Sequence, residues 1–373
     1  EKFTPHKKDR MMQGIVPEDG RLDGYEFEFQ SLLKLDQRMK RASGVHKSGY
    51  SNSQKNRFKN ILPNESTRVK LSKTRNSSTD YINANYVALE STQQHFQELP
   101  KPAVPVYIAT QAPLPKTIGD FWRMIYEQNS HIIVMLTHEL IDDEFVANSQ
   151  EESDDDMEKK LGGANGQFDA CINRNRVHKY WPSIGDSIIV DHGSFMVETV
   201  AENVQGDLIC RELYITPLVT HTDEKHKQHN VEEQQQPECL IMQRRKIHFL
   251  QYVGWPDMGV PNRTDTILKM VMKIEKLIEK ESSLAHKPIV IHCSAGIGRT
   301  GTFACIHLIL SQYRQYKKYL QSAEADRCND KFDFNIYNVV KQLKMQRIGM
   351  VQNKEQYVFC HTAILEYLKN ETD

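Results

Sequence analysis

A cysteine and an arginine six positions apart enclose a glycine-rich segment within residues 287–301. Cys293 follows an apolar, β-branched run that predicts a strand, and Arg299 opens a run that predicts a helix. Glycines lie between the two and just after them, at Gly296, Gly298 and Gly301. In such a loop the backbone N–H groups and the helix start can face one anion, which an arginine can bind with its planar fork. The same surroundings favour a cysteine thiolate, so the segment predicts phosphate-ester chemistry through a cysteinyl-phosphate.

Other kinds of site share part of this pattern. The run from Gly296 to Gly301 also matches the fingerprint of dinucleotide-binding folds, which requires a second parallel strand and an acidic residue about 20 residues on. Residues 321–331 are polar and lead into another predicted helix, so that strand is missing. A P-loop nucleotide site is excluded because no Gly-Lys-Ser/Thr follows the glycines. A buried structural cysteine is common by itself, but the coincidence of Cys293 with Arg299 and the glycines favours a nucleophile.

The composition is that of an ordinary globular chain without a strong net charge. The 373 residues are enough to bury a substantial hydrophobic core. The apolar share of 39% and the mean hydropathy of −0.60 are low for a globular chain, which indicates polar insertions in an otherwise ordinary domain. The formal net charge of −1 provides no global field for nucleic acid or for an acidic membrane, so we expect neither as a partner.

The cysteines and the start of the chain bear on its compartment. Seven cysteines are scattered without any Cys-x-x-Cys pair, which predicts neither a zinc site nor a thioredoxin-like motif. We expect a reduced, cytoplasmic protein with access to the nucleus, in which the cysteines other than Cys293 are small hydrophobic residues. No run of eighteen apolar residues and no signal-peptide pattern occurs, so no membrane segment is expected. The chain begins with Glu1 rather than Met, which indicates a piece of a longer protein.

Hydrophobic periodicity predicts a single α/β domain with a twisted mixed β-sheet flanked by α-helices. The helix over 264–280 is the clearest, because its apolar residues form one stripe behind Thr264, which we expect to cap it. Further helices are predicted over 22–42, 116–128, 299–319, 334–347 and 354–368. Apolar, β-branched runs predict strands near 105–110, 131–136, 187–190, 194–200, 208–216, 239–252 and 288–292. The cysteine loop lies between the last strand and a helix.

Polar stretches divide the chain into a tether and one domain with insertions. Residues 1–21 lack periodicity and are expected to form a polar N-terminal segment before a domain over 22–370. Polar, acidic or histidine-rich loop insertions are expected near 91–105, 147–167 and 219–237. The histidines of the third insertion lack accompanying ligands, so no metal site is expected. Ser153 in the acidic insertion is a candidate phosphorylation site, and the insertions could make regulatory contacts.

Several short motifs accompany the cysteine loop along the chain. They are residues 55–60 (Lys-Asn-Arg-Phe-Lys-Asn), 80–84 (Asp-Tyr-Ile-Asn-Ala), 111–114 (Gln-Ala-Pro-Leu), 120–122 (Asp-Phe-Trp), 180–182 (Tyr-Trp-Pro), 255–257 (Trp-Pro-Asp) and 352–356. With His292-Cys293, five residues, and Arg299-Thr300, they resemble in order the motifs of the classical, phosphotyrosine-specific protein tyrosine phosphatases. The resemblance covers residues 22–370 except the insertions. It implies a signalling enzyme that hydrolyses phosphotyrosine, with phosphotyrosine-containing proteins as partners and without a cofactor.

The resemblance assigns catalytic roles to seven residues. Cys293 would attack phosphorus, and Arg299 would bind two phosphoryl oxygens and stabilise their charge in the transition state. Asp257, on a mobile loop, would give a proton to the departing tyrosinate, whose pKa is about 10, and later take one from water. Gln352, assisted by Gln356, would place the water that attacks the phosphoenzyme. Thr300 would donate a hydrogen bond to the sulfur of Cys293, and His292 would orient the loop.

The resemblance also places the groups that would bind substrate. The phosphate would meet the backbone of the loop residues Ser294, Ala295, Gly296, Ile297 and Gly298. Phe58 stands where the family usually has Tyr, so it keeps the ring for stacking and loses the hydroxyl. Lys59 at the rim would favour acidic residues beside the phosphotyrosine, and Asn60 could bond the peptide backbone without charge assistance. Trp255 and Pro256 would anchor the loop that carries the acid.

Two other functions remain as alternatives. A pseudo-phosphatase that only binds phosphotyrosine would usually lack the nucleophile, the acid or the arginine, whereas Cys293, Asp257 and Arg299 are all present here. A broader phosphatase would act on phosphoserine, phosphothreonine or a phosphoinositide. The lipid enzymes that resemble this chain tend to carry Lys in the signature loop, whereas residues 294–298 are uncharged. A low-pKa thiolate is also oxidisable, so we expect reversible inactivation by peroxide at Cys293.

Overall fold

The structure, a computed structural model, describes residues 23–42, 44–74, 77–89, 105–139, 177–218, 244–256, 259–321 and 332–371. The predicted N-terminal segment and the three predicted insertions lie outside these residues, apart from Pro105 at the end of the first insertion. The domain boundary at residue 22 and the role of the insertions therefore stay predictions.

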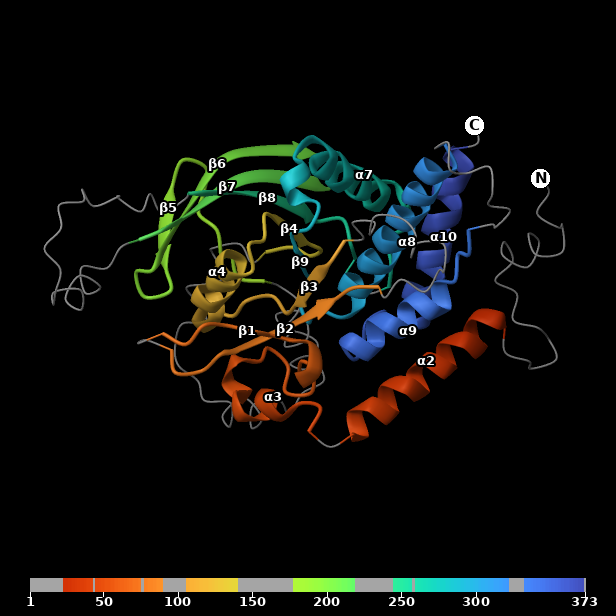
Figure 1. Cartoon of the computed structure of the whole chain (residues 1–373), viewed down its shortest axis with the longest axis horizontal. Coiled ribbons are helices and arrows are strands. Elements are labelled where there is room, and N and C mark those ends of the chain that lie inside the picture. Colours follow the sequence, from red (N-terminus) through yellow and green to blue (C-terminus); the bar gives the residue numbers. More distant parts are fainter. Residues whose placement is uncertain are drawn as a thin grey trace, which may run out of the picture.

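One sheet holds the nine strands of the described residues, in the order β1-β2-β3-β9-β4-β8-β7-β6-β5 (Figure 1). Their bounds are β1 (Arg68–Lys70), β2 (Tyr81–Val87), β3 (Tyr107–Thr110), β4 (Ile132–Met135), β5 (Ser187–Val190), β6 (Phe195–Gln205), β7 (Leu208–Pro217), β8 (Arg245–Tyr252) and β9 (Ile289–His292). The central strands β3, β9, β4 and β8 run parallel, and the pairs on either side are antiparallel. The predicted α/β class with a mixed sheet is confirmed.

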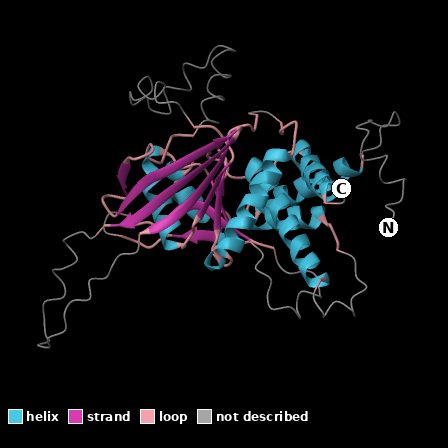
Figure 2. Cartoon of the chain, turned by 90° about the horizontal axis from the view of Figure 1, so that it is seen from above, coloured by secondary structure: helices cyan, strands magenta, loops and turns pink. Residues whose placement is uncertain are grey.

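Helices lie on both faces of this sheet, with most of them on one side (Figure 2). That side carries α2 (Gly24–Arg41), α7 (Asp265–Lys280), α8 (Gly298–Leu320), α9 (Ile336–Gln346) and α10 (Lys354–Asn370). The other side is covered by α4 (Ile118–Glu127), and the short α3 (Lys47–Ser51) lies near β2. The first and last long helices of the described chain, α2 and α10, therefore contact each other on the same side of the sheet.

Strand β9 shows how the sheet separates two apolar cores. Ile289 and Ile291 belong to the core shared with α2 and α7–α10, whereas Val290 belongs to the core shared with α4. Successive side chains of a strand point to opposite faces, so a central parallel strand buried on both faces needs a continuous apolar run. All four residues of β9 are buried. The strand therefore holds the start of the cysteine loop rigidly at its C-terminal end.

The C-terminal ends of the central strands are level with one another. Thr110 of β3 and Met135 of β4 both pair with His292 of β9. In open α/β sheets, ligands bind in the crevice outside the carboxyl ends of the parallel strands. The segments that follow these three strands therefore meet at one edge, where the cysteine loop begins.

The structure differs from the predicted elements at the start of the sheet. Strands β1 and β2 were not predicted, because β2 buries Asn83 and Asn85, which have low strand propensity. Strand β6 continues to Gln205 rather than ending at residue 200, since it pairs with β7 along its whole length. The predicted strand 239–252 begins at Arg245, and residues 239–243 lie outside the described part.

Helix α7 follows the predicted stripe but not the predicted cap. Ile267, Met270, Val271 and Ile274 are buried, as the spacing requires. Thr264 occupies the N-cap position, yet its side chain makes no capping hydrogen bond. Its hydroxyl instead donates to the carboxylate of Glu366 on α10, at 2.6 Å. The capping prediction is therefore wrong, and the residue joins two helices.

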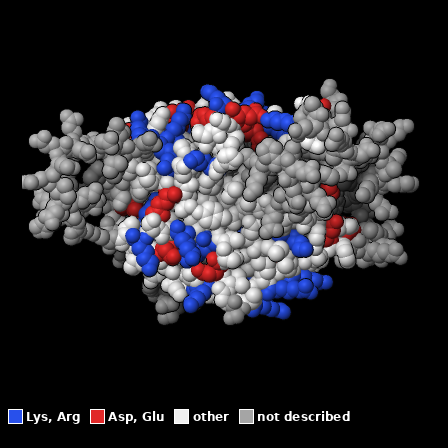
Figure 3. All heavy atoms as spheres, viewed as in Figure 1, with Lys and Arg blue, Asp and Glu red and all other residues white. Residues whose placement is uncertain are grey.

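The described surface mixes charges of both signs. Figure 3 shows Lys and Arg side chains interspersed with Asp and Glu on one face, and a basic group at the lower right, where α2 lies in Figure 1. The last turns of α2 carry Arg38, Lys40 and Arg41, whose charge complements the negative end of the helix dipole. No helix in the described ranges combines the length and apolarity needed to cross a membrane.

Candidate active site

The cysteine loop joins the end of β9 to the start of α8. Cys293 is 5% exposed, and the N–H of Gly296 donates to its Sγ atom at 3.3 Å. Burial alone would raise the pKa of the Cys293 thiol, but hydrogen bonding by Thr300 and Gly296 and the charge of Arg299 lower it below its ordinary value. The Thr300 hydroxyl is buried and bonds no nitrogen or oxygen of the described residues, which leaves it available to the sulfur. The loop therefore favours a thiolate.

Two glycines, Gly296 in the loop and Gly301 in the first turn of α8, are required by the close approach of neighbouring segments. Gly296 has a φ of 72°, and a Cβ atom there would lie 2.0 Å from the carbonyl oxygen of Thr110 at the end of β3. A Cβ atom on Gly301 would lie 2.3 Å from the backbone nitrogen of Val351. Larger residues at either position would push the loop away from the segments that support it.

His292 is fully buried directly before Cys293. Its Nδ1 lies 3.0 Å from the carbonyl oxygen of Cys293, and its Nε2 lies 2.6 Å from the hydroxyl of Tyr180. Burial lowers the pKa of His292 to about 4, so the ring is neutral near pH 7. The neutral ring then donates from Nδ1 and accepts at Nε2. This arrangement fixes the carbonyl of Cys293. The predicted role of His292 in orienting the loop during catalysis stays a prediction.

Arg299 lies in the first turn of α8, partly exposed on the open side of the loop. Its Nη1 donates to the carbonyl oxygen of Leu136, at 3.2 Å, in the segment after β4. Its Nη2 donates to the carbonyl oxygen of Pro256, at 3.0 Å. The guanidinium therefore links the cysteine loop to the residue that precedes Asp257.

A second arginine, Arg347, supports the loop from the interior and was missed by the sequence reasoning. It is fully buried, and its guanidinium donates to the carbonyl oxygens of Gly296 and Ala295 at 2.8 and 3.2 Å. It also donates to the side-chain oxygens of Asn85 and Asn83 at 2.8 and 2.9 Å. Burial lowers the pKa of Arg347 to about 10, which still leaves it charged near neutral pH. Nothing in its local sequence distinguishes it from a surface cation at a helix end.

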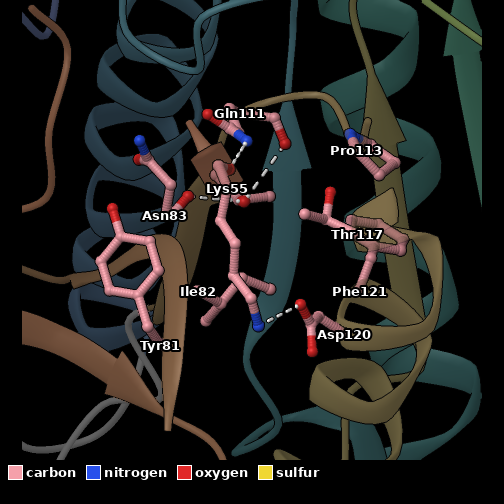
Figure 4. A pocket seen from close by; sticks show the side chains of 10 residues that line it. Lys55, Tyr81, Ile82, Asn83, Gln111, Pro113, Thr117, Asp120 and Phe121 are labelled. Atoms are coloured by element: carbon pink, nitrogen blue, oxygen red, sulfur yellow. Dashed lines mark hydrogen bonds and ion pairs between the residues drawn. The ribbon is translucent and has the colours of Figure 1, made fainter. Parts of the chain in front are cut away.

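The predicted substrate loop, residues 55–60, is fastened to Gln111, which directly follows β3. The side chain of Gln111 accepts from the backbone N–H of Arg57 at 2.9 Å and donates to the carbonyl oxygen of Lys55 at 2.8 Å. Lys55 also forms an ion pair with Asp120 of α4 at 2.9 Å. Figure 4 shows Lys55 between Gln111 and Asp120 in a small cavity beside β2. Because the residue after Gln111, Ala112, donates its N–H to the carbonyl of Ser294 at 2.9 Å, the two loops keep a fixed separation.

The three predicted specificity residues follow this anchor. Phe58 is half-buried, whereas Lys59 and Asn60 are exposed. Arg57 before them is held by the carbonyl oxygens of Ala112 and Pro113, at 3.3 and 3.2 Å. The loop thus has one half-buried aromatic side chain and presents two polar side chains to solvent.

The two predicted glutamines lie over the start of α8. A Cβ atom on Gly298 would lie 2.9 Å from Nε2 of Gln356 and 3.0 Å from Oε1 of Gln352. The backbone N–H of Gln352 donates to the side-chain oxygen of Gln356 at 2.8 Å. Gln356 is buried, whereas Gln352 is exposed.

The structure describes the two ends of the predicted acid loop, which runs from Trp255 to Gly259 and carries Asp257. Trp255 is buried, and its Nε1 donates to the carbonyl oxygen of Gly259 at 3.3 Å, which closes the base of the loop. Pro256 is exposed. Asp257 lies outside the described residues, so its predicted role remains a prediction. The described residues contain no group of three or more His, Cys, Asp or Glu side chains that could hold a metal ion.

The family of the chain follows from its similarity to known protein families. A model of the protein-tyrosine phosphatase family matches residues 52–153 and 168–366, which is most of the chain. The chain belongs to the protein-tyrosine phosphatase family. The match includes the cysteine loop, the substrate loop, both arginines and both glutamines.

Individual members of the protein-tyrosine phosphatase family resemble the chain over most of its length. It is 31% identical over 327 residues to tyrosine-protein phosphatase non-receptor type 20 of Rattus norvegicus, covering 87% of this chain and 57% of that protein. The Homo sapiens protein of the same name is 32% identical over 343 residues, covering 91% and 60%. Receptor-type tyrosine-protein phosphatase eta of Homo sapiens is 30% identical over 324 residues, covering 86% and 18%. The chain thus spans less than two thirds of these phosphatases.

Proposed function

We propose that the chain hydrolyses phosphotyrosine in proteins through a cysteinyl-phosphate intermediate. The observation that carries the proposal is the lowered pKa of the Cys293 thiol in a loop that also supplies Arg299 and converging backbone N–H groups. A buried sulfur held as a thiolate beside an arginine fork is suited to attack a phosphate dianion. Family membership and the names of the relatives support the same activity.

In the first step the Cys293 sulfur attacks phosphorus opposite the ester oxygen. The S–P bond forms, the P–O bond to the tyrosyl ring breaks, and the ring oxygen leaves with the electron pair. Arg299 binds the equatorial oxygens, and Asp257 gives its proton to the leaving oxygen. Since Arg299 already contacts the carbonyl of Pro256, phosphate binding and placement of the acid loop would be coupled.

In the second step water releases phosphate and restores the thiolate. The water oxygen attacks phosphorus, the S–P bond breaks, and the sulfur leaves with the electron pair. Asp257, now a carboxylate, takes the proton of the water, while Gln352 places the water and Gln356 assists. Thr300 bonds the departing sulfur. The position of Gln352 beside Gly298 supports this assignment.

Selectivity for tyrosine comes from the depth of the entrance. Because Gln111 ties the substrate loop to the strand end that also bonds Ser294, Phe58 would stand at a fixed height above Cys293. A long aryl phosphate can then reach the sulfur while the ring stacks on Phe58, and a short phosphoserine cannot. Lys59 would favour acidic neighbours of the phosphotyrosine, and Asn60 would bond the peptide backbone.

The cellular setting belongs to the proposal as well. We infer a role in signalling, in the cytoplasm with access to the nucleus, on phosphotyrosine-containing proteins. The insertions would carry regulatory contacts. Peroxide would inactivate the enzyme reversibly at Cys293, because its thiolate character favours oxidation.

Replacement of the nucleophile tests the proposal. Cys293→Ser should abolish phosphate release from a phosphotyrosine peptide and still bind the peptide, as followed by fluorescence anisotropy. The matched control is Cys210→Ser, at a partly exposed free cysteine on β7, which should retain full turnover. Substantial phosphate release by Cys293→Ser would contradict the mechanism. Equal turnover of a phosphothreonine peptide by the unaltered chain would favour the broader phosphatase instead.

A further inference from the structure

Polar groups from opposite ends of the chain meet in the interior behind the turn that precedes Gln352. Lys344 in the last turn of α9 is fully buried, and its Nζ atom lies 2.6 Å from Oδ2 of Asp36 on α2. The same ammonium donates to the carbonyl oxygen of Val351 at 3.2 Å. The other carboxylate oxygen of Asp36 accepts the N–H of Gly349 at 3.1 Å. The ion pair thus holds the turn at both of its ends.

The turn has a backbone that needs such support. Gly349 has a φ of 88° and Val351 a φ of 55°, both in the left-handed region. A β-branched residue is strained there and keeps that conformation only when its surroundings impose it. On the side away from the ion pair, the N–H of Val351 donates to the carbonyl of Ile297 in the cysteine loop, at 3.2 Å. Val351 therefore connects Lys344 with the cysteine loop, one residue before Gln352.

The hydrogen bonds of this ion pair indicate that it fixes the position of the turn, rather than only stabilising the fold. A buried ion pair contributes little to stability compared with well-packed apolar side chains, because both charges lose their hydration. Here each partner also bonds a backbone group of the same turn, which apolar side chains could not do. The pair therefore specifies one conformation of the turn.

We propose that Asp36 and Lys344 are positioning residues for Gln352 and thereby set the rate at which the phosphoenzyme is hydrolysed. This inference rests on the proposed function, in which Gln352 places the water that attacks phosphorus while the S–P bond breaks and Asp257 takes the proton. Formation of the phosphoenzyme does not require that water. Loss of the pair should therefore slow the second chemical step and spare the first.

The decisive variant is the double replacement Asp36→Leu/Lys344→Met, which removes both charges and fills their space with apolar atoms. The two steps are measured by rapid quench with a phosphotyrosine peptide labelled with ³²P, because label on the protein reports the phosphoenzyme. We expect label to form at a rate within about twofold of the unaltered chain and to decay about tenfold more slowly or worse, as expected for a misplaced catalytic group. Phosphoenzyme should therefore accumulate.

Stability is measured in parallel by urea unfolding, to separate positioning from folding. Asp36→Leu alone leaves the Lys344 ammonium buried and without its carboxylate, so it should unfold at lower urea than the double variant. The double variant should regain stability without regaining the hydrolysis rate. Lys344→Met alone removes the bond to the carbonyl oxygen of Val351 and provides the kinetic test if the double variant does not fold.

The matched control breaks another contact between the same two helices. Ser31 of α2 and Tyr337 of α9 share a hydrogen bond of 3.0 Å that does not involve the turn. Ser31→Ala should leave both the formation and the decay of the label unchanged.

Two results would overturn the inference. One is a double variant that hydrolyses its phosphoenzyme at the unaltered rate. The other is a parallel loss of both steps in proportion to the unfolded fraction, since that would make the pair a folding element only. If the unaltered chain forms no labelled protein and releases no phosphate, the proposed function itself fails, and this inference fails with it.

Discussion

The front and the back of the cysteine loop each contact an arginine, and the two arginines use their donors differently. Arg299 at the front is partly exposed and bonds two backbone carbonyls, those of Leu136 and Pro256. Arg347 at the back is fully buried and bonds four oxygens, two of the loop backbone and two of asparagine side chains. The front arginine can exchange a carbonyl for phosphate oxygens, whereas the back arginine has its donors committed to protein oxygens.

The difference shows how one loop combines rigidity with chemistry. A buried guanidinium is tolerated only when its donors are satisfied, and those bonds orient the carbonyls of Ala295 and Gly296 backwards. The N–H of Gly296, in the same peptide as the Ala295 carbonyl, points the opposite way and donates to Sγ of Cys293. In the mechanism proposed above, Arg347 prepares the loop and Arg299 binds the phosphate of the substrate.

The largest expected effect is a loss of phosphatase activity when Arg299, rather than Arg347, is replaced. Arg299→Lys keeps the charge but loses the planar fork, so kcat for a phosphotyrosine peptide should fall by ~10²–10³. The free energy of unfolding should change by less than about 1 kcal/mol, because the side chain is partly exposed. Steady-state kinetics and urea unfolding of the purified variant check both expectations.

The second prediction distinguishes the two arginines by their effect on the free energy of unfolding. Arg347→Lys cannot reach all four oxygens with one ammonium group, so at least one buried carbonyl or amide oxygen loses its partner. Each such loss costs about 1–3 kcal/mol, and urea unfolding should show a decrease in that range or above. We expect a kcat loss of only about tenfold, as for a small displacement of the loop. If Arg347→Lys were as stable as the unaltered chain and as inactive as Arg299→Lys, the distinction between front and back would be wrong.

The smallest expected effect concerns the sulfur itself. Thr300→Val removes a hydroxyl that lowers the pKa of Cys293, so that pKa should rise toward its ordinary value. With a higher pKa less thiolate is present at pH 6, and the pH midpoint of alkylation by iodoacetamide should move upward. Thr302→Val is the control, because that hydroxyl donates to the carbonyl of Gly298 rather than to the sulfur. An unchanged midpoint in Thr300→Val would mean that the loop N–H groups and Arg299 alone hold the thiolate.

The sequence was informative where a pattern is local. The apolar run before Cys293 indicated a buried strand, and the glycines after it indicated a tight turn, because both follow from the chemistry of adjacent residues. The structure places the predicted loop between β9 and α8 in that way. The spacing of apolar residues likewise located α7 and the strands β3, β4 and β9 to within a few residues.

The features that the sequence did not predict depend on contacts between residues far apart in the chain. Lys344 and Arg347 lie near the end of a predicted helix, where exposed cations are common, yet both are buried. Lys344 is matched by Asp36, which lies 308 positions earlier. Strand β2 was missed for the same reason, since its buried asparagines find their hydrogen-bond partners far away in the sequence. Arg347 bonds the side-chain oxygens of both Asn83 and Asn85, and their amides donate to residues 56–67. No local pattern carries that information.

The dependence of the loop on Arg347 has a consequence during synthesis. Cys293 leaves the ribosome before Arg347 does, and the carbonyls of Ala295 and Gly296 stay without their guanidinium until α9 has formed and packed. In an unfinished or unfolded chain Cys293 is an ordinary thiol with a pKa of about 8.5, mostly protonated at neutral pH. A nascent chain therefore carries an unreactive cysteine that oxidants attack slowly. We therefore expect Cys293 to become a thiolate only when folding is nearly complete.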